Sequence, residues 1–153
     1  MSITKISDIK NRYYKILLIA GTRGSGKTTN LKKFAQELQC SIVNLNYEIS
    51  KKMIDIPREE WNNHIDSVIN EVLLDSDQPV IIDNIEILFS PEFQADPLQI
   101  LKRLSRTRVV IASWPGSFSN GKLIHGSMND EEYSVASGTD IADIEIYSLP
   151  VVR

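Results

Sequence analysis

The segment that most constrains the fold is a glycine-rich stretch, GTRGSGKTT at residues 21–29, which directly follows the apolar run YYKILLIA. Residues 14–20 predict a fully buried strand, which is typical of parallel sheets covered by helices on both faces. From Lys27 onward the apolar residues recur at helical spacing, at Leu31, Phe34, Ala35 and Leu38. A strand, a tight turn and a helix in this order predict an α/β sheet with the turn at the carboxyl end of a strand.

The alternation of strands and helices continues along the chain. Further strands are predicted at 41–46, 79–84, 108–113 and 143–149, and helices at 2–12, from Pro57 to Leu73 and from Pro97 to Leu104. The Asn-Gly turn at 120–121 predicts a hairpin over 122–136, at the edge of the sheet or the rim of its site. No repeat, linker or helical lid domain is indicated. The sequence therefore predicts one domain over 1–153 with a five-stranded, mostly parallel sheet.

The glycine-rich segment carries the first chemical signal. Residues 21–28 fit the pattern G-x-x-x-x-G-K-[ST], in which backbone N–H groups and the start of the following helix surround phosphate groups. Lys27 is expected to reach the outer phosphates, and Thr28 to supply a hydroxyl to Mg²⁺. We therefore predict that a nucleotide contacts Gly21, Thr22, Arg23, Gly24, Ser25, Gly26, Lys27, Thr28 and Thr29.

Asp83 is the predicted partner of this loop. It ends the apolar run PVIID, and ligands of open α/β sheets bind at the carboxyl ends of the strands. Thr28 and Asp83 are therefore the predicted metal ligands. The loop and this aspartate together indicate a three-layer P-loop NTPase fold with an AAA+/ASCE-like core, in which 41–46 supplies the extra strand between the loop and Asp83.

The residues after Asp83 depart from the pattern of many ATPases. Asn84 stands where a glutamate often takes the proton of the attacking water, and an amide cannot accept that proton. Glu86 could substitute if the turn swings it inward, although a solvent-facing charge is the simpler interpretation. We therefore expect intrinsic hydrolysis to be slow, or to depend on a partner.

Two other positions are candidates for a part in hydrolysis. Ser113 ends the next strand, where a hydroxyl could bind the attacking water or the outer phosphate; an ordinary loop serine is the alternative. With Lys27 and Asp83 it completes the predicted catalytic set. Arg103, Arg106 and Arg108 precede that strand, far from the chain's own nucleotide, and one of them could reach the site of a neighbouring copy. Cations at a solvated helix end are the simpler explanation for them.

Several reaction classes can be compared on these residues. GTPases usually carry the guanine-recognition pattern [NT]-K-x-D. The nearest segment here, NGKL at 120–123, does not fit it, so ATP is the expected nucleotide. A small-molecule kinase usually carries an arginine-rich lid, and none is evident. An ATPase acting on the β–γ phosphoanhydride fits the order of elements best. A catalytically inactive, nucleotide-dependent scaffold or switch is the alternative, because of Asn84.

Charge and composition limit the surroundings of the protein. The net charge of −3 gives no general attraction to nucleic acid, so DNA contact is expected only through partners or a narrow basic patch such as KRLSRTR. The longest early apolar run is too short for a membrane helix. A single cysteine, Cys40, cannot form an internal disulfide, and the expected location is the cytoplasm.

Three stretches together resemble the BrxF family, the small P-loop proteins of type III BREX phage-defence systems. They are GTRGSGKTT, residues 80–118 from VIIDNIEI to SWPGSF, and NGKLIHG at 120–126. The resemblance implies a bacterial cytoplasmic ATP-binding protein that works among other defence proteins, including a methyltransferase, a phosphatase-like protein and a larger ATPase. It carries the nucleotide roles onto 21–28 and Asp83, and assigns no role to Asn84, Ser113 or the arginines.

Overall fold

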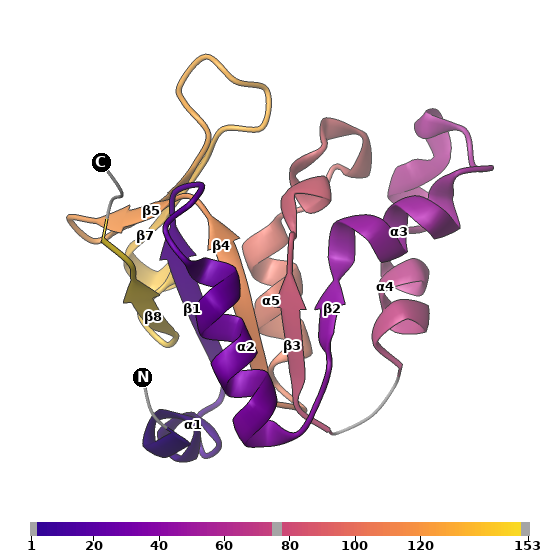
Figure 1. The fold of residues 1–153 in the computed structure, drawn as a ribbon. Helices are drawn as coiled ribbons and strands as arrows, with labels where there is room; N and C mark the ends of the chain where they lie inside the picture. Colours follow the sequence, from indigo (N-terminus) through magenta and orange to yellow (C-terminus); the bar gives the residue numbers. More distant parts are fainter. Residues whose placement is uncertain (1–2, 75–77, 151–153) are drawn as a thin grey trace.

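The computed structural model describes residues 3–74 and 78–150, and its centre is a sheet of five parallel strands (Figure 1). The strands lie in the order β2-β3-β4-β1-β8, and every neighbouring pair is parallel. Their bounds are β1 Ile16–Gly21, β2 Ile42–Asn44, β3 Val80–Asp83, β4 Val110–Pro115 and β8 Glu145–Ser148. The predicted five-stranded α/β sheet is confirmed.

Helices cover both faces of this sheet and complete three layers. One face packs against α1 (Ile3–Ile9) and α2 (Lys27–Leu38), and the other against α3 (Leu45–Met53), α4 (Ile65–Leu73) and α5 (Pro97–Leu104) (Figure 1). Successive side chains of a strand point to opposite faces, so Leu17 joins the core beside α2 while Ile16 and Leu18 join the other core. Both faces of β1 are buried, which is why its sequence is apolar throughout.

Two helical segments differ from the predicted pattern. The strand predicted at 41–46 ends at Asn44, whose side chain accepts a hydrogen bond from Tyr47 N at 3.1 Å and caps α3, a helix that the sequence did not predict. The helix predicted from Pro57 begins instead as the 3₁₀ helix η1 (Arg58–Asn63), and α4 starts at Ile65. The indole N–H of Trp61, in η1, donates to Ile56 O at 2.9 Å, in the segment that precedes this helix.

The order of the strands in the sheet differs from their order along the chain. The strand at 42–44 lies between the loop and Asp83 along the chain, but in the sheet β2 is an edge strand. It is β4 that lies between β1 and β3, because Val110 pairs with both Ile16 and Val80. The carboxyl end of β4 therefore lies between the glycine-rich loop and Asp83.

A second, smaller sheet follows β4. It is antiparallel and contains β5 (Ser117–Ser119), β6 (Lys122–His125) and β7 (Ser134–Ser137) in that order. Asn120 and Gly121 both have positive φ, 52° and 73°, as the two-residue turn between β5 and β6 requires. The predicted hairpin is thus confirmed and gains β5 as a third strand. From there to β8 the described chain forms only the short 3₁₀ helix η4 (Gly138–Asp140), and no helical lid.

Short 3₁₀ helices connect β3 to α5. They are η2 (Glu86–Phe89) and η3 (Pro91–Phe93), and the Asp96 side chain then caps α5 by accepting from Leu98 N at 3.0 Å. The helix predicted from Pro97 to Leu104 is confirmed. Across residues 3–74 and 78–150, none of the helices combines the length and the apolar character that crossing a membrane requires.

Candidate functional site

The glycine-rich loop joins β1 to α2 at the carboxyl edge of the sheet. Gly24 and Gly26 have φ of 81° and 99°, in the left-handed region that a side chain would make costly. Gly26 directly precedes the first turn of α2, so the loop delivers the chain to the N-terminal end of a helix, where the helix dipole attracts anions. The backbone therefore has the conformation that a phosphate-binding turn requires.

A cavity of about 860 Å³ opens beside this loop. Its volume lies within the range of small-molecule and cofactor sites. The lining residues come from the loop and α2, the turn after β3, and the small sheet: Thr22, Arg23, Gly24, Gly26, Lys27, Thr28, Thr29, Asp83, Asn84, Glu86, Pro115, Gly116, Ser117, Ile124 and Gly126. The structure thus brings most of the predicted nucleotide contacts and Asp83 to one cavity.

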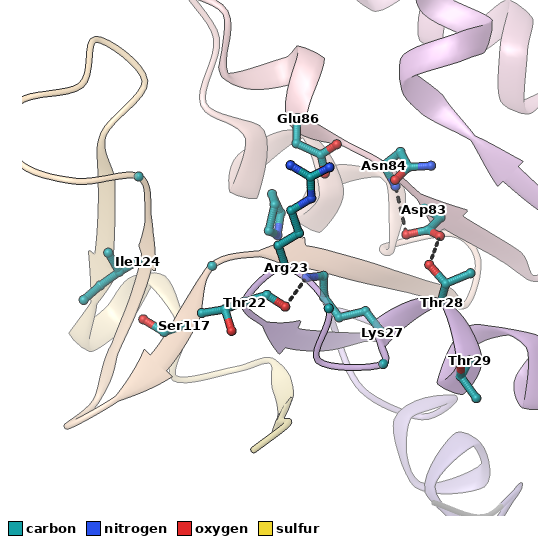
Figure 2. A pocket seen from close by; sticks show the side chains of 15 residues that line it. Thr22, Arg23, Lys27, Thr28, Thr29, Asp83, Asn84, Glu86, Ser117 and Ile124 are labelled. Carbon is teal, nitrogen blue, oxygen red and sulfur yellow. Dashed lines mark hydrogen bonds between the residues drawn. The ribbon is translucent and has the colours of Figure 1, made fainter. Parts of the chain in front are cut away.

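Asp83 is the centre of a hydrogen-bond network at the bottom of this cavity. Its Oδ2 accepts a hydrogen bond from Thr28 Oγ1 at 2.7 Å (Figure 2), and its Oδ1 accepts from Ser113 Oγ at 2.5 Å and from Asn84 N at 3.0 Å. The side chain is largely buried, since only 6% of the residue is exposed. These contacts fix the carboxylate against the hydroxyl of the phosphate-binding loop.

Thr28 and Asp83 fit the protein share of a magnesium site. Mg²⁺ prefers oxygen ligands and usually keeps several waters, with one or two protein ligands and the substrate phosphates. A hydroxyl and a carboxylate that already touch supply this share. Among the described residues, no group of three or more His, Cys, Asp or Glu side chains is arranged to hold a metal ion. A metal there would neutralise charge on the outer phosphates.

Lys27 lies across the loop from this pair. Its Nζ donates to Gly21 O at 2.5 Å and to Thr22 O at 3.1 Å. Burial lowers the pKa of Lys27 below the usual lysine value, and the carboxylates of Glu86 and Asp83 partly oppose that shift. Nearby, Ser25 Oγ is buried without a hydrogen-bond partner in the described ranges. Buried hydroxyls in proteins nearly always form a hydrogen bond. The described chain offers none to this hydroxyl, so the hydrogen bonding of the loop is incomplete without a further group.

The turn after β3 places Glu86 in the cavity wall, whereas the sequence favoured a solvent-facing side chain. Asn46, in the first turn of α3, causes this. Its Nδ2 donates to Glu86 Oε2 at 2.8 Å, its Oδ1 accepts from Ile87 N at 2.7 Å, and its N–H donates to Asn84 O at 2.8 Å. Sequence reasoning missed Asn46, because its approach to Glu86 depends on the pairing of β2 with β3, which no local pattern shows.

Asn84 itself has φ of 55°, so the chain turns sharply there. Its N–H binds Asp83, and its side chain contributes an amide to the cavity wall. Ser113 lies behind Asp83, with 1% of the residue exposed, and it is not part of the lining. The position of Ser113 favours an action through Asp83 over direct contact with phosphate or water.

The small sheet and the end of β4 form one side of the cavity, which is the rim position that the sequence allowed for the predicted hairpin. Its lining residues are Pro115, Gly116, Ser117, Ile124 and Gly126. A Cβ atom at Gly116 would lie 1.8 Å from the backbone oxygen of Ile124, so β6 can approach the end of β4 only because this residue is glycine. Gly116 directly follows β4, and the sequence alone did not show that β6 would approach it. The cavity therefore extends beyond the loop.

The three candidate arginines lie before β4, at the opposite end of that strand from the loop. Arg103 pairs with Asp66 at 3.0 Å, and the guanidinium of Arg106 lies 4.5 Å from the centre of the Tyr13 ring. Arg108 differs, because it is buried and donates to the carbonyl oxygens of Leu73, Leu74 and Gln78. Arg108 is thus unsuited to reach a neighbouring copy, while Arg103 and Arg106 are exposed.

Comparison with known families agrees with this geometry. A family model described as an AAA domain matches residues 13–115, which is more than half of the chain. The match contains the loop, Asp83 and β4, while the small sheet and β8 lie outside it. No curated protein matches the chain. The chain therefore belongs to the AAA domain family and is a nucleotide-binding P-loop protein.

Proposed function

We propose that the chain binds Mg-ATP as one domain over residues 1–153, and that it hydrolyses ATP slowly on its own. The observation that carries this proposal is the contact between Thr28 and Asp83, which joins the loop to the end of β3 at 2.7 Å. The phosphates would lie along 21–29, with Lys27 on the outer phosphates and the metal held by Thr28 and Asp83. The absence of the guanine pattern supports ATP over GTP.

The proposal of slow hydrolysis rests on the turn after β3. Asn84 cannot accept a proton from water, which leaves Glu86 as the carboxylate nearest to that task in the cavity wall. Glu86 Oε2 is engaged by Asn46 at 2.8 Å, so one of its oxygens is already occupied. A partner or a second copy that shifts the first turn of α3 would release Glu86 from Asn46, and the rate of ATP hydrolysis would rise. Ser113 contributes by holding Asp83 in position.

Self-assembly would offer a second source of stimulation. Arg103 and Arg106 are exposed at the far end of β4, and an arginine from a neighbouring subunit can neutralise charge that develops on phosphate. The same basic stretch is the place for any direct contact with DNA. Neither interaction requires a net positive charge on the whole protein.

The resemblance to the BrxF family supports a biological setting. We propose that the chain acts in the bacterial cytoplasm, within a BREX-type phage-defence system, and contacts other proteins of that system. In this setting ATP could be fuel or a bound ligand that controls assembly. The engagement of Glu86 by Asn46 favours the second candidate function, a nucleotide-dependent switch or scaffold without turnover.

The experiment is ATP turnover per subunit, measured over a wide range of protein concentration in Mg²⁺ and again in excess chelator. Lys27→Ala is the blank, because it removes the cation of the phosphate loop. Turnover that rises with concentration would support a site completed between subunits, and the paired change Arg103→Ala with Arg106→Ala should then abolish the rise. ATP binding without turnover at any concentration would support the switch. A high rate in dilute monomer would contradict slow hydrolysis.

A further inference from the structure

Arg23 differs from the other arginines in residues 3–74 and 78–150. In that part of the chain it has no hydrogen bond, ion pair or ring contact with another residue, although it projects from the phosphate-binding loop. The other arginines all have partners: Arg12 with Glu145, Arg58 with Glu92, Arg103 with Asp66, Arg106 with Tyr13, and Arg108 with three carbonyl oxygens. Among the arginines that the structure describes, Arg23 alone has an exposed guanidinium with none of its donors in use, and it lies at the cavity.

The direction of the Arg23 side chain indicates where its guanidinium could bind a ligand. Arg23 lines the cavity, and its guanidinium extends from the loop toward Glu86 (Figure 2). The two charged groups do not form an ion pair in the structure as described. Space between a cation on the loop and a carboxylate on the opposite wall is therefore open to a ligand group.

The other residues of the site indicate which ligand group that is. The backbone N–H groups of the loop and of the first turn of α2 would bind the inner phosphates. Lys27 and the metal held by Thr28 and Asp83 would bind the outer ones. Glu86 lines the same cavity, and the proposed function assigns to it the activation of the attacking water. The group between Arg23 and Glu86 is consequently the phosphate that is attacked, which is the terminal one.

We propose that Arg23 binds the terminal phosphate of a nucleoside triphosphate and makes the site select triphosphates over diphosphates. This inference rests on the proposed nucleotide site. A guanidinium can donate two parallel N–H hydrogen bonds to two phosphate oxygens, whereas an ammonium cannot. Arg23 would therefore bind the phosphate through its paired donors as well as through its charge. The chain thereby supplies in its own loop a cation for the outer phosphate.

The test compares the dissociation constants of ATP and ADP, each with Mg²⁺, for wild type, Arg23→Gln, Arg23→Lys and Arg58→Gln. Arg58 is the matched control, since it is an exposed arginine outside the cavity and its change removes the same charge. We expect Arg23→Gln to weaken ATP binding on the order of tenfold to a hundredfold and ADP binding less than about twofold. Arg23→Lys should lie between wild type and Arg23→Gln, and Arg58→Gln should match wild type.

Two results would overturn the inference and leave the proposed function standing. Equal losses for ATP and ADP would mean that Arg23 acts on the loop or an inner phosphate, and unchanged constants would mean that it faces a partner. A wild type that binds neither nucleotide would overturn both proposals together. Thermal unfolding of Arg23→Gln without nucleotide should match wild type, because the side chain is exposed and makes no contact to lose.

Discussion

Ser113 donates a hydrogen bond from its buried hydroxyl to Asp83 Oδ1 at 2.5 Å, while Thr28 holds the other carboxylate oxygen at 2.7 Å. The two residues lie on adjacent strands, because Ile82 pairs with Ala112 one position earlier. The insertion of β4 between β1 and β3 is what brings this serine behind the predicted metal ligand. Ser113 thus positions Asp83.

Ser113→Ala should weaken Mg²⁺-dependent ATP binding on the order of fivefold to tenfold, because Asp83 loses one of its three donors. Binding measured in excess chelator should not change. Titration calorimetry with and without Mg²⁺ separates the two effects. Ser119→Ala, an exposed serine on β5, serves as the control. An equal loss with and without Mg²⁺ would instead indicate contact with the nucleotide itself.

Glu86→Gln should reduce ATP turnover by about a hundredfold or more, because a neutral amide cannot accept the proton of the attacking water. ATP affinity should not fall, since the substitution removes a negative charge that faces the phosphates. Steady-state turnover and equilibrium binding check the two parts. Glu37→Gln, on the exposed side of α2, should leave both unchanged. Unaltered turnover in Glu86→Gln would exclude this carboxylate as the base.

The affinity for ATP should decrease with rising pH before an ordinary lysine would titrate. Burial lowers the pKa of Lys27 in the free protein, so its proton is lost below the reference value of 10.5. Loss of the cation removes its attraction for the outer phosphates, and affinity falls as pH rises through the lowered pKa. Binding should be followed from pH 7 into the alkaline range. Lys27→Arg stays charged throughout and should show no such decrease.

Arg108→Ala should lower the free energy of unfolding by about 3 kcal/mol, because it leaves buried carbonyl oxygens without their charged donor. Arg103→Ala removes an exposed ion pair and should cost less than about 1 kcal/mol. Urea denaturation of the two variants gives the comparison. Similar stability of both variants would show that Arg108 is not the structural arginine of this cluster.

Most of the fold, and the part of the site formed by the glycine-rich loop and Asp83, could be predicted from the sequence. Both signals are local: β1 is apolar at every position, and the glycine loop encodes its own backbone conformation. Asp83 could be found because it directly ends a buried strand. These features need no knowledge of how distant segments pack.

Two of the missed features depend on contacts between segments that are far apart in the chain. Asn46 reaches Glu86 only because the ends of β2 and β3 are neighbours, which no local pattern shows. The helix α3 is different, because its cap is a local contact from Tyr47 N to Asn44, at the residue where strand β2 ends. Gly116 allows β6 to approach β4, and that requirement becomes visible only once the small sheet is placed.

The strand order has a consequence for how the protein is made. Leu17, in the strand that carries the glycine loop, pairs with Ile111 on one side and Glu145 on the other. During synthesis, β1 therefore leaves the ribosome long before either neighbour exists, and it cannot be enclosed until β8 has been translated. Pairing between segments so distant in the chain slows folding and leaves an apolar strand open to aggregation. Nascent chains that stop before Glu145 should need a chaperone.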